Sequence, residues 1–438
     1  MSDLLLTPVA GPFVAESTPP GSKSLTNRAL VLAALADGDS ELNNCLFADD
    51  THVMIQCLMR LGFDLRVDRA TNSIAVHGSS GNVPANQAEL FCGNSGTTIR
   101  FLTAICALGR GRYVLDGIPR MRQRPIAQLE QLLKNLGVRI NYLMNQGFPP
   151  VEVFGDGLPG GIAQFGNAQS SQFLSAALMV CPYARNEVNI DLVGEQTSWP
   201  YVAMTMQLMD HFGVMSEVQL DKLTAQPRMI TVPRAKYAGA AYAVEPDASN
   251  ASYFLAAAAI HNRAKVTVHG LGKQSLQPDV GFADVLHNMG ASLVLGTNSV
   301  TVIGTDRLQA IDVDLRNMPD VAQTLAVVAM FAEGATTIRG LHTLRHKETD
   351  RIAALATELK KFGADVDIQT DDLVITPPRK LTAAAVDTYD DHRMAMSFAL
   401  AGTKIAGVTI RDAQCVNKTY PAFFQDLTNV LTSHTNQA

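Results

Sequence analysis

Small hydroxyl residues, glycine and cationic residues occur together at several points of the chain, immediately before runs of apolar residues. Six such groups are present: Gly21-Ser22-Lys23-Ser24, Asn94-Ser95-Gly96-Thr97, Gln169-Ser170-Ser171-Gln172, Asp247-Ala248-Ser249-Asn250, Pro319-Asp320 and Asp390-Asp391-His392-Arg393. Each group taken alone is typical of a helix N-cap, and that interpretation stays open. Glycine beside hydroxyls at several helix starts indicates more, because free N–H groups and the positive end of a helix together bind phosphate.

Lysines and arginines occur at similar places in the sequence. They are Lys23, Arg28, Arg100, Arg124, Lys347, Arg351, Arg393 and Lys418. A cation on a helix usually belongs to a solvated face. Near a helix start, however, the helix dipole disfavours a positive charge unless an anion lies between them. These positions therefore predict a polyanionic ligand.

One competing phosphate motif is excluded by its spacing. The segment 20–24 resembles the end of a Walker A loop, which requires contiguous Gly-Lys-Ser/Thr and another glycine five positions before its second glycine. Ser22 interrupts the first requirement, and Glu16 stands where the second requires glycine. The sequence therefore does not favour a P-loop NTPase.

The elements that must position these residues repeat along the chain. An amphipathic helix that ends in glycine before a short strand occurs five times, at Gly62, Gly137, Gly213, Gly290 and Gly363, which are 75, 76, 77 and 73 residues apart. Glycine suits the position after a helix, where the backbone turns through positive φ. The near-constant spacing predicts a repeated unit.

A second element recurs with the same period. It consists of a small or polar opening, an alanine-rich apolar helix, a break and a β-branched strand, and it covers 24–42, 96–115, 171–190, 249–268, 320–338 and 392–410. Six units of about 73 residues account for all 438 residues and predict two similar α/β lobes of three units each. The alternative is an ordinary doubly wound sheet, a fold that rarely keeps a fixed long period.

Composition narrows the class of protein. The net charge of −6 argues against nucleic acid or a membrane surface as a partner. The six cysteines contain no CxxC pair, so we expect a reduced cytoplasmic protein without a structural metal. No segment reaches the length of about 18 apolar residues that a membrane span needs, and the N-terminal residues do not form an export signal.

Seven longer motifs carry a resemblance to a known family. The chain resembles the 5-enolpyruvylshikimate-3-phosphate synthase family at 20–28, 92–100, 121–125, 170–173, 345–351, 391–396 and 417–421. The resemblance implies two lobes, each an inside-out α/β barrel of three βαβαββ repeats, at 22–240 and at 1–21 plus 241–438, with a cleft between them. It also implies transfer of the enolpyruvyl group of phosphoenolpyruvate to the 5-hydroxyl of shikimate 3-phosphate by a monomer that needs no cofactor.

The resemblance also assigns site residues by motif position. Shikimate 3-phosphate is expected at Lys23, Ser24, Arg28, Ser170, Ser171, Gln172, Ser198, Tyr201, Asp320, Thr343 and Lys347. Phosphoenolpyruvate is expected at Lys23, Asn94, Gly96, Arg124, Gln172, Arg351, His392, Arg393 and Lys418. Two residues depart from the family pattern: Thr343 replaces a common Asn, and Phe101 replaces a common Pro, so we expect a shifted start for the helix near Gly96.

The implied reaction needs an acid and a base in one pocket. Asp320 is the candidate for the hydroxyl proton and Glu348 for the proton on carbon, while Lys23, Lys347 and Arg393 offset negative charge. Without the family match, an N-cap and a surface ion pair would explain the two carboxylates equally well.

Two rival functions remain as alternatives. The sister transferase acting on UDP-N-acetylglucosamine typically uses a loop cysteine, and the corresponding loop 116–124 has none. A non-catalytic anion-binding repeat protein would have no use for Asp320 and Glu348 among the cations.

Overall fold

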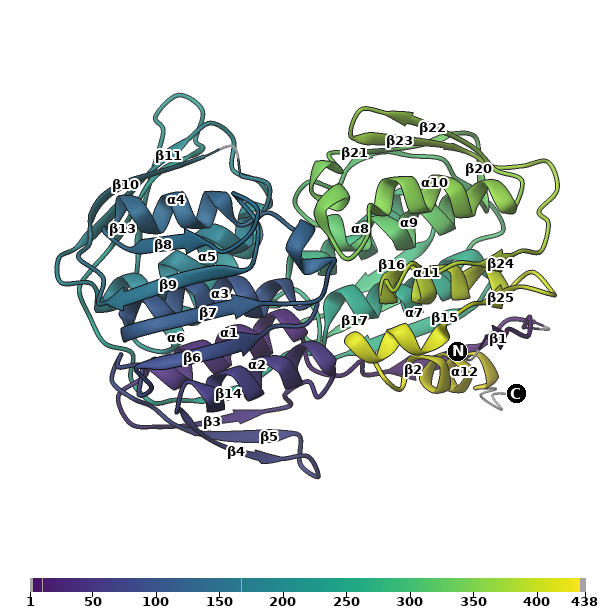
Figure 1. The fold of residues 1–438 in the computed structure, drawn as a ribbon. Coiled ribbons are helices and arrows are strands. Elements are labelled where there is room, and N and C mark those ends of the chain that lie inside the picture. Colours follow the sequence, from purple (N-terminus) through teal and green to yellow (C-terminus); the bar gives the residue numbers. More distant parts are fainter. Residues whose placement is uncertain (1–2, 10, 167, 434–438) are drawn as a thin grey trace. The chain divides into compact units, whose positions relative to one another are not determined.

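The structure is a computed structural model that describes residues 3–9, 11–166 and 168–433. The chain divides into two compact α/β units. The inserted unit is Gly21–Val244, and the flanking unit combines Met1–Pro20 with Glu245–Ala438. Figure 1 shows the inserted unit in purple to teal and most of the flanking unit in green to yellow.

Three four-stranded sheets build the inserted unit. In each sheet the first two strands are parallel and the remaining pairings are antiparallel. In sheet order they are β14 (Ala241–Ala243), β3 (Asp39–Asn43), β5 (Ser73–His77) and β4 (Asp64–Asp68); β6 (Gln87–Phe91), β7 (Arg110–Asp116), β9 (Val151–Asp156) and β8 (Arg139–Tyr142); and β10 (Gly161–Gly166), β11 (Val188–Val193), β13 (Pro227–Val232) and β12 (Glu217–Leu220).

The flanking unit repeats this topology in two of its sheets. These are β16 (Ser292–Leu295), β17 (Ser299–Ile303), β15 (Lys265–His269) and β2 (Val14–Ser17); and β19 (Asp312–Asp314), β21 (Thr336–Arg339), β23 (Asp372–Thr376) and β22 (Asp365–Gln369). Its smaller sheets are β1 (Leu4–Leu5), β25 (Thr409–Ile410) and β24 (Ala385–Val386), and β18 (Leu308–Gln309) with β20 (Ala332–Glu333).

The helices are of two kinds. The apolar kind comprises α1 (Lys23–Leu35), α3 (Gly96–Leu108), α5 (Ser171–Val180), α7 (Ala248–Ile260), α9 (Ala322–Ala329) and α11 (His392–Gly402). The amphipathic kind comprises α2 (Asp49–Arg60), α4 (Ala127–Asn135), α6 (Trp199–His211), α8 (Phe282–Asn288), α10 (Arg351–Lys361) and α12 (Phe423–Thr432). Each apolar helix precedes a strand, which confirms the second recurring element in all six copies.

The glycine signal is also confirmed. Gly62, Gly137, Gly213, Gly290 and Gly363 follow helices α2, α4, α6, α8 and α10 and have φ of 88°, 91°, 87°, 107° and 93°. A side chain at such a backbone angle would be strained, which is why glycine recurs there.

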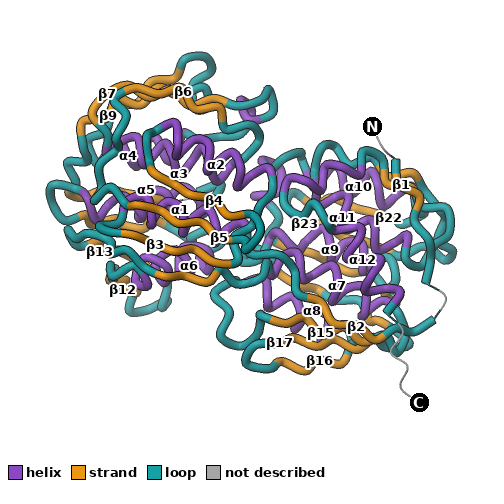
Figure 2. The backbone as a smooth tube through the Cα atoms, turned by 90° about the horizontal axis from the view of Figure 1, so that it is seen from below, coloured by secondary structure: helices purple, strands orange, loops and turns teal. Residues whose placement is uncertain are grey.

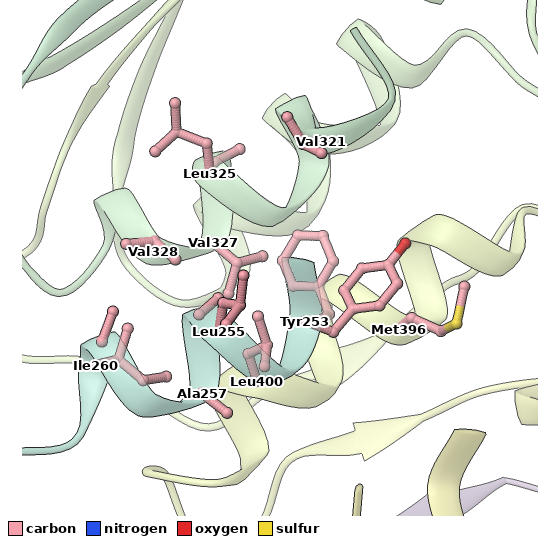
Figure 3. Close-up of a cluster of buried hydrophobic side chains, with 14 of the residues drawn as sticks. Tyr253, Leu255, Ala257, Ile260, Val321, Leu325, Val327, Val328, Met396 and Leu400 are labelled. Carbon is pink, nitrogen blue, oxygen red and sulfur yellow. The ribbon is translucent and has the colours of Figure 1, made fainter. Parts of the chain in front are cut away.

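The apolar helices form the interior of each unit. Every residue of α3, α7, α9 and α11 is buried, and a helix that is buried on all sides must lie inside. In Figure 2 strands lie around the helices within each unit. Figure 3 shows Leu255, Val327 and Leu400, from α7, α9 and α11, packed in the core of the flanking unit. The first N–H groups of each helix have no partner within the helix and need capping groups.

None of the described helices has the length and apolarity that a membrane crossing needs.

Candidate active site

The first helix of the inserted unit begins with a lysine beside a carboxylate. Ser22 caps α1 by accepting a hydrogen bond from the Leu25 N–H at 3.4 Å. Lys23 is the first helical residue, and its Nζ lies 3.3 Å from Oδ2 of Asp50 at the start of α2. Both side chains are largely buried. The ammonium therefore sits against a protein carboxylate, which offsets its unfavourable place at the positive end of α1.

Arg28 is buried one turn further along α1, where it contacts neutral oxygens. Its Nε donates to the Thr205 hydroxyl at 2.7 Å, and its Nη1 donates to the Ser24 carbonyl at 3.0 Å. Its guanidinium lies 5.2 Å from the ring centroid of Phe101. Burial lowers the pKa of Arg28 to about 10. Within the described part of the chain no carboxylate forms an ion pair with this buried cation, so an anionic ligand would supply the missing counter-charge.

Gly96 allows a second arginine to approach the start of α3. A Cβ on Gly96 would lie 2.4 Å from Nη2 of Arg124, well inside contact distance. Arg124 is buried, and its Nη1 donates to the Asn94 carbonyl at 2.8 Å and to the Asn94 side chain at 3.3 Å. Its Nε has no partner among the described residues. A side chain at position 96 would therefore displace the Arg124 guanidinium, which occupies the space of a Cβ.

The helix that starts at Gly96 reaches well beyond Phe101. Gly96 is the first residue of α3, so Phe101 lies in its second turn and is fully buried. Its ring packs against Arg28. A proline at 101 would remove a helical hydrogen bond beyond the first turn, so the replacement of Phe101 by Pro carries a structural cost in this chain.

Arg100 joins the starts of α3 and α5. Its Nη1 donates to the Ser170 hydroxyl at 3.2 Å and to Oε1 of Gln172 at 2.7 Å. The Ser170 hydroxyl in turn caps α5 by accepting from the Gln172 N–H at 3.3 Å. Ser171 is the first residue of α5 and is half-buried. One of the hydroxyls predicted to hold a phosphate, that of Ser170, therefore already binds a guanidinium.

The start of α6 is linked to Arg28 through the Thr205 hydroxyl. Ser198 is buried and has a left-handed backbone, with φ of 50°, immediately before α6. Tyr201 follows in the first turn, and its carbonyl accepts from the Thr205 hydroxyl that binds Arg28. We call this set the inserted cluster: Lys23, Ser24, Arg28, Asp50, Asn94, Gly96, Arg100, Arg124, Ser170, Ser171, Gln172, Ser198 and Tyr201.

In the flanking unit, the carboxylate of one aspartate forms ion pairs with three cationic side chains. Asp320 lies in a 3-10 turn, Pro319–Val321, just before α9. Its Oδ1 is 3.3 Å from the Lys347 ammonium and 3.2 Å from Nη1 of Arg351, and its Oδ2 is 3.2 Å from Nη2 of Arg393. This arrangement holds an aspartate at the centre of a cationic group.

Arg351 extends the network to two more carboxylates. Its Nε lies 2.6 Å from Oδ2 of Asp391, and its Nη2 lies 2.8 Å from Oε2 of Glu348. Glu348 is buried, and its other oxygen is 3.9 Å from the Lys418 ammonium. Burial disfavours the charge on Arg351, but attraction to Asp391, Glu348 and Asp320 outweighs it and raises the pKa. The guanidinium is therefore a fixed cation.

The start of α11 presents two more of the predicted residues. Asp391 caps the helix by accepting from the Arg393 N–H at 2.9 Å. His392 is the first helical residue and is buried, with Nδ1 3.7 Å from Oδ1 of Asp391. Burial opposes the charge on Arg393, yet Asp320 and the other nearby acids raise its pKa well above the usual value. We call this set the flanking cluster: Asp320, Lys347, Glu348, Arg351, Asp391, His392, Arg393 and Lys418.

Thr343, also predicted to contact shikimate 3-phosphate, is not linked to the other predicted residues by a hydrogen bond in the described chain. It lies in the 3-10 turn His342–His346, which precedes Lys347, and its hydroxyl is buried without a partner in the described chain. Ion pairs and the start of α11 bring the other predicted residues of this unit together. Within the described chain, no hydrogen bond joins the Thr343 hydroxyl to them.

Protein carboxylates explain part of what the sequence attributed to a ligand. Lys23, Arg351 and Arg393 lie in the first turns of their helices, and each faces an aspartate of its own unit: Asp50, Asp391 and Asp320, respectively. Sequence reasoning missed Asp50, although the pair Asp49-Asp50 opens a helix after a predicted strand. Arg28 and Arg124 make no ion pair in the described residues, and they still indicate an anion.

The two clusters are suited to binding phosphate and carboxylate groups and to moving protons at a carboxylate. No group of three or more His, Cys, Asp or Glu side chains in the described residues has a geometry that could hold a metal ion.

Comparisons with known proteins place these residues in a family context. The family model of EPSP synthase (3-phosphoshikimate 1-carboxyvinyltransferase) matches residues 10–427. A 3-phosphoshikimate 1-carboxyvinyltransferase of a Sulfurovum species is 44% identical over 431 residues, covering 98% of this chain and 99% of the relative. The chloroplastic enzyme of the same name from Arabidopsis thaliana is 47% identical over 428 residues, 94% of this chain and 81% of that protein. An EPSP synthase structure from Acinetobacter baumannii matches with a TM-score of 0.80 and 24% identity, covering 98% of each chain.

Proposed function

This chain belongs to the EPSP synthase (3-phosphoshikimate 1-carboxyvinyltransferase) family, and we propose that the inserted and flanking clusters are the machinery of its reaction. Its function is EPSP synthase activity in the shikimate pathway. The reaction takes phosphoenolpyruvate and shikimate 3-phosphate and releases phosphate. The observation that carries the proposal is Asp320, a carboxylate held by three cations beside a buried glutamate.

Shikimate 3-phosphate is assigned to residues of both units. Arg28 offers a buried guanidinium that has no counter-ion among the described residues of its unit. Ser170, Ser171 and Ser198 lie at helix starts. Hydroxyls and the positive ends of α5 and α6 suit the 3-phosphate. Lys23, Ser24, Gln172, Tyr201, Asp320, Thr343 and Lys347 complete this assignment.

Phosphoenolpyruvate is assigned to the arginines and to Lys418. Arg124 lies against Gly96, and its Nε has no hydrogen-bond partner in the part of the chain that the structure describes. Arg351 and Arg393 remain charged in the flanking unit. A planar guanidinium matches a carboxylate or a phosphate in a bidentate manner, which suits a substrate that carries both groups. Lys23, Asn94, Gly96, Gln172, His392 and Lys418 join this group.

The chemistry begins with two proton movements. Asp320 accepts the proton of the 5-hydroxyl while that oxygen forms a bond to C2 of phosphoenolpyruvate, and Glu348 delivers a proton to C3, which becomes a methyl group. In the tetrahedral adduct, C3 then returns a proton to the Glu348 carboxylate, the C2–C3 double bond forms again, and the C2–O bond to phosphate breaks, so that phosphate leaves with the electron pair of that bond. Lys23, Lys347 and Arg393 stabilise the negative charge of the adduct and of the leaving phosphate.

The architecture and cellular setting form part of the same proposal. Five sheets with one shared topology and fully buried central helices support two inside-out barrels of βαβαββ repeats, bounded near 22–240 and 1–21 plus 241–438. The six cysteines are free, which agrees with a reduced cytoplasmic protein. We propose that the enzyme acts as a monomer.

Phosphate release tests the function directly. Purified protein should release inorganic phosphate from phosphoenolpyruvate when shikimate 3-phosphate is present. UDP-N-acetylglucosamine should not replace shikimate 3-phosphate. Turnover with the nucleotide sugar alone, or no phosphate release with either acceptor, would contradict the assignment.

A further inference from the structure

A buried glutamate outside the flanking cluster holds the turn that leads into it. Glu358 lies in α10 and is completely buried, although its side chain is acidic. An isolated buried carboxylate is costly, so such a group is expected to have hydrogen-bonding or ionic partners. The partners of Glu358 belong to α10 itself and to the segment 387–389.

Three groups satisfy Glu358. The Tyr389 hydroxyl donates to Oε1 at 2.7 Å, and the Asp387 N–H donates to Oε2 at 3.0 Å. The Lys361 ammonium lies 2.7 Å from Oε2. Lys361 also lies 2.7 Å from Asp387, whose other oxygen is 2.9 Å from Arg411. Asp387, at the start of the turn, is therefore held by a hydrogen bond of its backbone N–H and by ion pairs of its side chain.

The turn has a backbone that needs such support. Tyr389 and Asp390 are consecutive non-glycine residues with φ of 56° and 54°. A left-handed backbone at a non-glycine residue costs on the order of 1–3 kcal/mol and persists only where the surroundings enforce it. The next residue is Asp391, which caps α11 and binds Arg351.

The same helix holds both ends of this turn. Arg351 and Glu358 are seven residues apart in α10, a spacing that places two side chains on one face of a helix. Arg351 binds Asp391 at the end of the turn, and Glu358 binds Asp387 and Tyr389 at its start. The segment that delivers His392 and Arg393 is thus fixed at two points from one surface.

We propose that Glu358 is a positioning residue for this transferase, acting through Tyr389 to hold the turn that orients Asp391, His392 and Arg393. The inference rests on the proposed role of His392 and Arg393 in binding phosphoenolpyruvate. In the described chain, the hydrogen bonds and the ion pair of Glu358 go to Asp387, Tyr389 and Lys361, which are outside the flanking cluster. Loosening the turn would therefore alter phosphoenolpyruvate binding more than binding of shikimate 3-phosphate.

The first test is Tyr389→Phe, which removes one hydroxyl and keeps the ring. Tyr389 is 40% exposed, so the variant should fold. Because Asp387 and Arg351 still hold the turn, we expect the KM for phosphoenolpyruvate to rise about 3- to 10-fold, with little change in the KM for shikimate 3-phosphate. Glu358→Gln loses the charge and places an amide against the donors, so its effect should have the same direction and be larger.

The matched control is Tyr113→Phe in the inserted unit. Tyr113 is buried, and its hydroxyl donates to the Ala85 carbonyl at 2.6 Å. Neither residue belongs to either cluster. This variant should lose some thermal stability and keep both KM values. A purely structural role for Glu358 would lower Tm in the same way without moving the KM for phosphoenolpyruvate.

The outcomes separate the positioning role from the function itself. The proposal is overturned if both test variants keep the wild-type KM for phosphoenolpyruvate, if both KM values rise equally, or if the control shows the same rise. Absence of phosphate release by the wild-type protein would instead overturn the proposed function, because that result does not depend on Glu358.

Discussion

Replacement of Gly96 by alanine should weaken the binding of phosphoenolpyruvate and leave the fold and the binding of shikimate 3-phosphate little changed. The new Cβ would lie 2.4 Å from Nη2 and 2.9 Å from Cζ of Arg124, where ordinary contact begins near 3.4 Å. The guanidinium must therefore retreat by about 1 Å, a displacement large enough to impair a binding site. Arg124 is the end of a flexible side chain, so the cost falls on its position and the fold should remain intact.

The magnitude follows from the charge-assisted hydrogen bond that a displaced Arg124 could no longer make to phosphoenolpyruvate. In the wild-type protein the Arg124 Nη1 lies 2.8 Å from the Asn94 carbonyl, and this bond fixes the position from which the guanidinium would donate. A hydrogen bond from a charged donor contributes about 1.5–3 kcal/mol, which corresponds to about a 10- to 150-fold rise in the KM for phosphoenolpyruvate. The Tm and the KM for shikimate 3-phosphate should change little.

Steady-state phosphate release with one substrate varied at a time measures both constants. Gly11→Ala is the matched control, because a Cβ at Gly11 meets nothing within 4 Å. Wild-type binding of phosphoenolpyruvate in Gly96→Ala, with the protein folded, would refute the link from this glycine through Arg124 to the substrate.

Three further predictions concern other parts of the two clusters and one exposed histidine. Asp320→Ala and Glu348→Gln should each lower kcat by about 100-fold or more, as expected for proton-transfer groups, and near-normal kcat in both would remove them from the mechanism. Arg28→Met should raise the KM for shikimate 3-phosphate by about 10-fold or more while Tm stays level or rises, because the variant removes a buried charge that has no carboxylate partner; a large loss of Tm measured by calorimetry would contradict this. The pKa of His77 is raised by its hydrogen bond to Asp39, so its contribution to stability is present below the ordinary histidine pKa and is lost as pH rises through the raised one. Thermal melts of His77→Gln and wild type should therefore converge as pH rises from about 6 to about 8.5, and a gap that widens would show that the sign is wrong.

Local rules explain which parts of the fold the sequence could predict. The glycines that end α2, α4, α6, α8 and α10 are required by backbone angle alone, so their spacing revealed the repeat directly. The alanine-rich segments were recognisable because a helix buried on all sides must be apolar throughout.

Partners across the fold were not predictable in the same way. Asp50 meets Lys23 only because α2 packs beside α1, and nothing in the local sequence of either helix specifies that contact. The 3-10 turn before α9 and the burial of Glu348 between Arg351 and Lys418 likewise depend on tertiary packing. Gly96 was recognised by motif, but its physical reason, the guanidinium of Arg124, required coordinates.

The pairing of β2 with β15 has a consequence for biosynthesis. Val14–Ser17 leaves the ribosome early, but its parallel partner Lys265–His269 emerges about 250 residues later. The whole inserted unit, including its own closing strand β14, is synthesised in that interval. During translation the inserted unit can therefore complete its three sheets first, while β2 waits as an unpaired strand exposed to proteases and chaperones. In the folded protein the Asp247 N–H donates to the Pro20 carbonyl at 2.9 Å, which joins the two segments where the chain passes between the units. A nascent chain arrested before residue 265 should therefore contain one protease-resistant unit, 21–244, preceded by a protease-sensitive segment that includes β2.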